Sequence, residues 1–141
     1  MKTVNKPKIL IILQNAYTSI PGKQINPVYD MRSVYRKNAT YSRIIPYLES
    51  NFELFFTECT RKLASDPKTK FKTELDWVKK AINHDKWFAV IAFSSQAHQA
   101  CDDLNFKPFA KLPHPVSFKW RKQLMVDTAQ QLRDKLLITL S

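Results

Sequence analysis

Glycine is almost absent from this chain of 141 residues, in which Gly22 is the single example. The common phosphate-binding loops need several glycines at fixed spacing, because their backbone must approach the phosphate groups closely. The sequence therefore excludes a glycine-rich phosphate loop of either the mononucleotide or the dinucleotide type.

Cysteine is scarce as well, with Cys59 and Cys101 far apart and no histidine at ligand spacing from either. Two thiols cannot by themselves form a four-ligand zinc or iron–sulfur site. We therefore expect no metal and no cofactor, and two reduced, buried cysteines of a cytoplasmic or nucleoid-associated protein. The apolar run over residues 9–13 is too short for a signal peptide core or a membrane span, so we expect neither secretion nor membrane insertion.

Positive charge is what the chain has in excess, with 23 Lys and Arg against 12 Asp and Glu, which gives a net charge of +11. So much positive charge on a small domain predicts a polyanionic partner, most often a nucleic acid. The alternative is a solvated basic face that has no partner.

Apolar runs and helical spacing alternate along the chain. We expect strands over residues 8–14, 52–59, 87–93 and 106–112. We expect helices over residues 40–50, 73–84, 95–104 and 120–137, the third capped by Ser94 and Ser95. Residues 18–37 and 60–72 are interpreted as loops. This order predicts one α/β domain over residues 1–141, a three-layer sandwich with a four-stranded parallel sheet and helices on both faces.

Polar residues follow each predicted strand. In a parallel sheet they gather at the carboxyl edge, where open α/β sheets usually bind ligands. We expect this edge to collect residues 14–17, residues 57–59, residues 94–95 and His114.

Two short motifs stand at opposite ends of the chain. The first reads Leu13-Gln14-Asn15-Ala16-Tyr17, and the second reads His114-Pro115-Val116-Ser117-Phe118. In these motifs and in its element order, the chain resembles the uracil-DNA glycosylase superfamily. The best-known branch of that superfamily has Gly-Gln-Asp-Pro-Tyr and His-Pro-Ser-Pro-Leu there, on a four-stranded parallel sheet with helices on both sides.

The resemblance implies a role for each matching residue. It implies that Asn15 positions the attacking water, that His114 stabilises the departing base and that Tyr17 crowds the 5-position of a pyrimidine. It implies that Phe118 is the wedge that fills the gap left by a flipped nucleotide. The residues expected to bind the base are Gln14, Tyr17, Thr57 and Tyr41, and Tyr29 and Tyr35 are alternatives to Tyr41 as the aromatic residue that stacks on the base. The residues expected to bind DNA, duplex or single-stranded, are Arg36, Arg43, Ser117, Phe118, Lys119, Arg121 and Lys122.

The chain also departs from the family pattern. Asn15 stands where the family has an aspartate, and an amide can orient water but cannot accept its proton at neutral pH. Leu13 replaces a glycine, and Thr57 or Glu58 occupies the region where the family has its base-reading asparagine. Asn15 can equally cap a turn, and Glu58 is interpreted as half of a surface ion pair rather than as an acid or base.

Three functions therefore remain. The leading hypothesis is a monomeric DNA glycosylase that flips a natural or modified base and hydrolyses its bond to the sugar. The rival is a catalytically inactive protein of the same fold that binds DNA or another protein. The third is an unrelated basic α/β protein that binds nucleic acid.

His84 and His98 are interpreted as surface residues of helices.

Overall fold

The computed structural model describes residues 6–14, 22–23, 25–30, 46–63, 71–112 and 122–140, with the backbone alone for residues 30 and 122–125.

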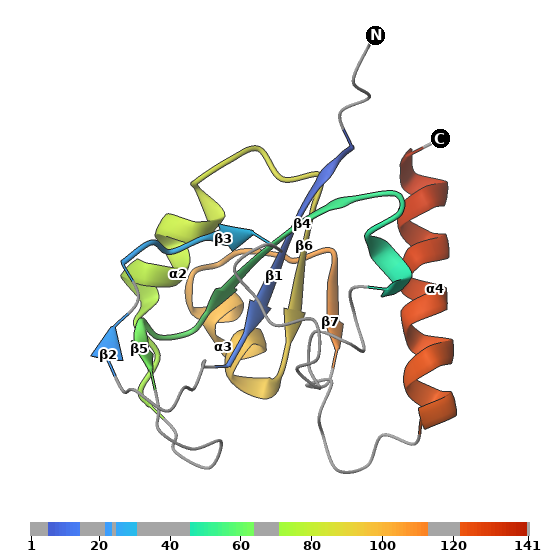
Figure 1. Cartoon of the computed structure of the whole chain (residues 1–141). Coiled ribbons are helices and arrows are strands. Elements are labelled where there is room, and N and C mark those ends of the chain that lie inside the picture. The colour runs from blue at the N-terminus through green and yellow to red at the C-terminus, as the bar shows by residue number, and fades with distance from the viewer. Residues whose placement is uncertain are drawn as a thin grey trace, which may run out of the picture.

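A parallel sheet lies at the centre of the protein (Figure 1). Strands β1 (Lys8–Leu13), β4 (Glu53–Glu58), β6 (Ala89–Phe93) and β7 (Ala110–Leu112) are parallel to one another, in the order β4-β1-β6-β7. In the middle strand, Ile11 lies beside Phe56 on one side and Ile91 on the other. The unbroken apolar run of β1 suits a central strand that is covered on both faces. The predicted α/β class and four-stranded parallel sheet are confirmed.

Three short strands lie where the sequence predicted loops. Strand β3 (Tyr29–Asp30) pairs antiparallel with β4, so in the described part of the chain the main sheet has five strands rather than four. Strand β2 (Gly22–Lys23) pairs antiparallel with β5 (Lys62–Leu63) in a separate two-stranded ribbon. The loop predictions over residues 18–37 and 60–72 were therefore wrong at these positions. A strand of two residues is too short to show the alternation on which sequence-based detection depends.

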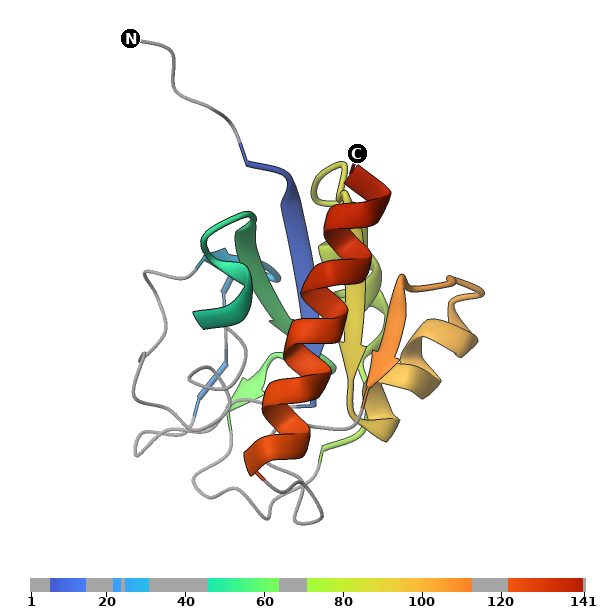
Figure 2. The same cartoon turned by 90° about the vertical axis from the view of Figure 1, so that its right-hand side faces the viewer.

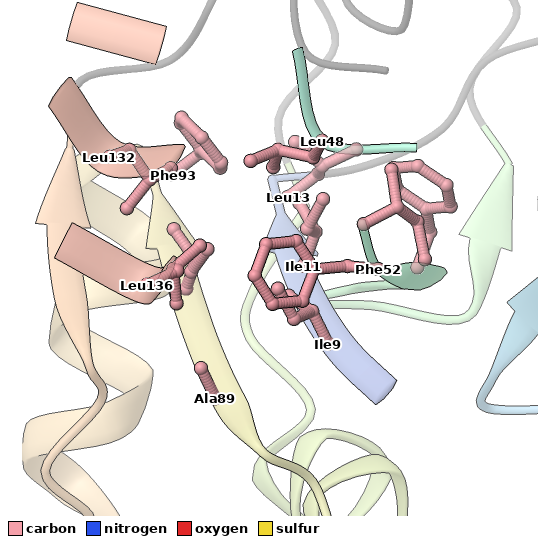
Figure 3. Packing of buried hydrophobic residues seen from close by; sticks show 12 residues of the cluster. Ile9, Ile11, Leu13, Leu48, Phe52, Ala89, Phe93, Leu132 and Leu136 are labelled. Atoms are coloured by element: carbon pink, nitrogen blue, oxygen red, sulfur yellow. The ribbon is translucent and has the colours of Figure 1, made fainter. Parts of the chain in front are cut away.

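Helices cover both faces of the sheet. Helices α2 (Leu75–Ile82) and α3 (Ser95–Asp103) lie on one side, and α4 (Lys122–Leu140) lies on the other (Figures 1 and 2). Successive side chains of β1 point to opposite faces, because the side-chain period of a strand is two. Leu10 and Ile12 join the cluster of α2 and α3, whereas Ile9, Ile11 and Leu13 pack with Leu132 and Leu136 of α4 (Figure 3).

Helices α2, α3 and α4 begin and end within three residues of the predicted bounds. Of the predicted helix over residues 40–50, only residues 46–50 are described; residues 46–48 are helical and residues 49–50 form a turn. The last strand is shorter than expected, because only residues 110–112 of the predicted 106–112 pair with β6. No helix in the described part of the chain has both the length and the apolar character that a membrane span requires.

Candidate active site

The carboxyl ends of β1 and β4 meet at one point of the sheet edge. Leu13 is the register partner of Glu58, and the Cys59 backbone N–H lies 3.0 Å from both the Leu13 and the Gln14 carbonyl oxygens. These contacts hold Gln14, the last described residue of the predicted water-positioning motif, against the end of β4. The end of β6 lies at the same edge, where the Ser94 N–H donates to the Leu112 carbonyl at 2.9 Å. The predicted gathering of polar strand ends is confirmed for these residues.

Glu58 is buried, with a relative exposure of 1%. Its Oε1 accepts a hydrogen bond from the Tyr29 hydroxyl, and the Tyr29 ring stacks on Phe56 with the ring centroids 5.8 Å apart. The interpretation of Glu58 as half of a surface ion pair was wrong. Strand β3 covers the outer edge of β4, and the pattern of residues does not predict that strand. A buried carboxyl group needs hydrogen-bonding partners, because the loss of water is costly. The Tyr29 hydroxyl is one such partner.

Thr57 is completely buried and points to the face of the sheet opposite Glu58, since neighbouring strand residues alternate. Its Oγ1 lies 3.5 Å from the Glu58 carbonyl oxygen, which is long for a hydrogen bond. A role for Thr57 in binding a base stays a prediction.

Cys59 and Cys101 are both free and buried, as the sequence predicted. Burial raises the pKa of the Cys59 thiol to about 12, and nearby Cys101 and Glu58 act in the same direction. Burial also raises the pKa of Cys101. Because the thiolate is the nucleophilic form, neither cysteine is poised for covalent chemistry at neutral pH.

Ser94 links β6 to α3 in an unusual backbone conformation, with φ 102° and ψ 153°. Its hydroxyl caps α3 by accepting a hydrogen bond from the Ala97 N–H at 3.2 Å, as the sequence predicted. A serine in this region of backbone space is strained, and such strain persists only where surrounding contacts maintain it. The strained residue Ser94 lies at the same carboxyl edge of the sheet as Glu58.

His98 was wrongly predicted as a surface residue. Its Nε2 lies 3.0 Å from the Ala92 carbonyl oxygen and 2.8 Å from the Leu112 carbonyl oxygen. Both partners are acceptors, so Nε2 carries the hydrogen. The ring therefore joins α3 to β6 and β7, a contact between distant segments that helical spacing cannot reveal.

A polar network extends beyond the sheet edge and holds the chain that follows β4. Glu74 accepts hydrogen bonds from the Arg61 backbone N–H at 2.8 Å and the Thr60 hydroxyl at 3.2 Å, and its Oε1 lies 3.3 Å from Arg61 Nε. Partial burial alone would raise the pKa of Glu74, but these hydrogen bonds and the charge of Arg61 lower it. Gln96 of α3 donates to the Phe71 carbonyl at 2.8 Å.

Most of the residues predicted to form the site lie outside the described part of the chain. They are Asn15, Tyr17, Arg36, Tyr41, Arg43, His114, Ser117, Phe118, Lys119 and Arg121. Lys122 is the first residue of α4, and its backbone alone is described. The roles of all these residues stay predictions. Among the described residues, no three His, Cys, Asp or Glu side chains are arranged to hold a metal ion.

Comparisons with known proteins identify no relative. No protein-family model matches the chain, and neither the curated proteins nor the solved structures contain a significant match. The resemblance to the uracil-DNA glycosylase superfamily rests on the two motifs and the element order.

Proposed function

We propose that this protein is a DNA N-glycosylase that takes one nucleotide out of the DNA stack and hydrolyses the bond between its base and its sugar. The observation that carries the proposal is the position of Gln14, which the Cys59 N–H holds at the carboxyl ends of β1 and β4. Ligands of open α/β sheets usually bind at this edge. The net charge of +11 supports a polyanionic substrate.

The proposed reaction is a displacement at the anomeric carbon of the sugar. The oxygen of a water molecule forms a bond to this carbon, and the bonding electrons of the carbon–nitrogen bond leave with the base. The proton lost by the water ends on the departed base. Asn15 would orient the water, and His114 would donate a hydrogen bond to the base as its negative charge develops. The protein would act as a monomer, in the cytoplasm or at the nucleoid.

The second candidate is an inactive protein of the same fold that binds DNA or another protein. One observation favours it, namely that Leu13 is buried in the core and stands where the glycosylase motif has a glycine. The Leu13 side chain packs in the core, whereas a glycine at this position would let a base approach the backbone.

Base release from a panel of oligonucleotides separates the two candidates. The panel carries uracil, hypoxanthine, 5-hydroxymethyl pyrimidines and glycosylated pyrimidines in otherwise identical strands. We expect the protein to release one of these bases, and the variants Asn15→Ala and His114→Ala to lose that activity. Lys107→Ala is the matched control, because Lys107 is exposed and precedes β7 at the opposite edge of the sheet. Tight DNA binding without release of any base would favour the inactive binder.

The wedge role of Phe118 has its own test. Phe118→Ala should reduce base release from duplex DNA far more than from single strands, because only a duplex leaves a stacked gap to fill. Equal losses on both substrates would refute the wedge.

A further inference from the structure

Two lysines face each other across the β2–β5 ribbon. Lys23 and Lys62 are register partners in this antiparallel pair, and both are exposed. Side chains directly opposite each other on antiparallel strands have Cβ atoms only about 4.5–5.5 Å apart. Like charges on side chains that are directly opposite each other in this way oppose the pairing of the strands.

The surrounding structure leaves this repulsion in place. Within the described ranges, the ion pairs join other lysines and arginines to carboxylates, and none includes Lys23 or Lys62. Lys62 Nζ lies 5.7 Å from the centroid of the Phe71 ring, which orders the side chain without neutralising it. The neighbouring Arg61 adds a third cation, although Glu74 offsets its charge.

The backbone that presents Lys62 is anchored by hydrogen bonds of the residues around it. The Lys62 N–H donates to the Thr60 hydroxyl at 3.3 Å, and the Glu74 N–H donates to the Cys59 carbonyl at 2.8 Å. Gln96 holds the Phe71 segment from α3. Such anchoring fixes the positions of the charges before a ligand arrives, which lowers the entropy lost on binding.

The ribbon lies beside the candidate active site. Lys62 follows Glu58 by four residues, so their Cα atoms are separated by at most ~14 Å. Figure 1 shows β2 and β5 beside the carboxyl end of β4, on the side of the sheet away from β7. A nucleic acid strand with one nucleotide at the sheet edge would carry its neighbouring phosphates toward the ribbon.

We propose that the β2–β5 ribbon binds the phosphate backbone of the DNA strand whose nucleotide occupies the candidate active site. The inference rests on the proposed function for its partner, and it adds Lys23 and Lys62 to the DNA contacts that the sequence predicted. Phosphates of the DNA strand that pair with Lys23 and with Lys62 replace the repulsion between the two lysines by attraction. The repulsion between the two lysines therefore lowers the stability of the free protein, and binding of the phosphate backbone removes this destabilisation.

The test combines DNA binding with thermal unfolding in the variants Lys23→Gln and Lys62→Gln. Each variant should lower the magnitude of the slope of log affinity against log salt concentration by about 0.9 on duplex DNA. Each should also raise the melting temperature of the free protein by roughly 1–3 °C, because the cross-strand repulsion disappears. Lys62→Arg should keep the slope. Lys107→Gln removes the same charge at the opposite edge and should change neither quantity.

The outcomes separate this inference from the proposed function. An unchanged slope in both glutamine variants, or a wild-type protein without salt-sensitive DNA binding, would overturn the ribbon as a phosphate site. A lower melting temperature in both variants would overturn the argument from repulsion. Reduced slopes in a protein that releases no base would refute the glycosylase and still support the ribbon.

Discussion

Replacing Ser94 by glycine should stabilise this protein, whereas replacing it by alanine should destabilise it. The two variants differ by one methyl group, but Ser94 has a φ of 102°, a conformation that side chains disfavour. Glycine removes the Cβ that causes the strain. Alanine keeps the Cβ and removes only the hydroxyl that caps the Ala97 N–H.

The expected magnitudes follow from these two effects. Backbone strain of this kind costs about 1–3 kcal/mol. Glycine at an N-cap loses only a few tenths of a kcal/mol relative to serine, and its greater freedom in the unfolded chain costs roughly 0.5–1 kcal/mol. Ser94→Gly should therefore raise the free energy of unfolding by about 1 kcal/mol. Ser94→Ala should lower it by about 1 kcal/mol, the usual cost of losing a cap.

Thermal and urea unfolding, followed by circular dichroism, would measure this difference. About 2 kcal/mol between the variants corresponds to roughly 6–8 °C in melting temperature for a chain of this size. Ser95→Gly is the control, because Ser95 is the exposed first residue of α3 and glycine there should only destabilise. If Ser94→Gly proves as unstable as Ser94→Ala, the strain at Ser94 does not exist as described.

Three further perturbations test the core and the buried polar groups. Leu136→Ala should lower the free energy of unfolding in urea by about 2–5 kcal/mol, because Leu136 is fully buried. Ile138 lies on the same helix but is 72% exposed, so Ile138→Ala should change this free energy by less than about 0.5 kcal/mol. Similar losses in the two variants would mean that α4 does not pack against the sheet as described. Tyr29→Phe should destabilise by about 1–3 kcal/mol, since Glu58 stays buried without this donor, and an unchanged unfolding midpoint would show that the hydrogen bond contributes nothing. Burial raises the pKa of the Cys59 thiol from about 9 to about 12, so between these pH values the folded state binds more protons than the unfolded state. The free energy of unfolding should therefore fall as the pH rises from about 9 towards 12, and Cys59→Ala should flatten this fall; an equal fall in the variant would assign it to other groups.

The strands and helices that the sequence predicted correctly are those with local signals. Residues 8–13 form β1 because their unbroken apolar run leaves no polar face for solvent. Ser94 caps α3 because its hydroxyl reaches an N–H only three residues away. The alternation of strands and helices also predicted the parallel sheet, and with it the meeting of Gln14 and the end of β4 at one edge.

The features that escaped prediction depend on contacts between distant segments. Strand β3 forms because its two residues pair with the outer edge of β4. The sequence of these two residues does not by itself predict a strand. The burial of Glu58 follows from that pairing, because Tyr29 reaches it only from β3. The contact of His98 with Leu112 likewise requires β7 to lie beside β6 first.

For this protein, the sequence alone determined the α/β class, the central strands, the excess of positive charge and the motifs behind the glycosylase proposal. These properties depend on composition and on spacing over a few residues. Only the tertiary structure decided that Glu58 is buried beneath Tyr29 and that Lys23 faces Lys62 across a ribbon. The physical reason is that burial and cross-strand register are properties of pairs of segments, and a single segment carries too little information to choose its partner.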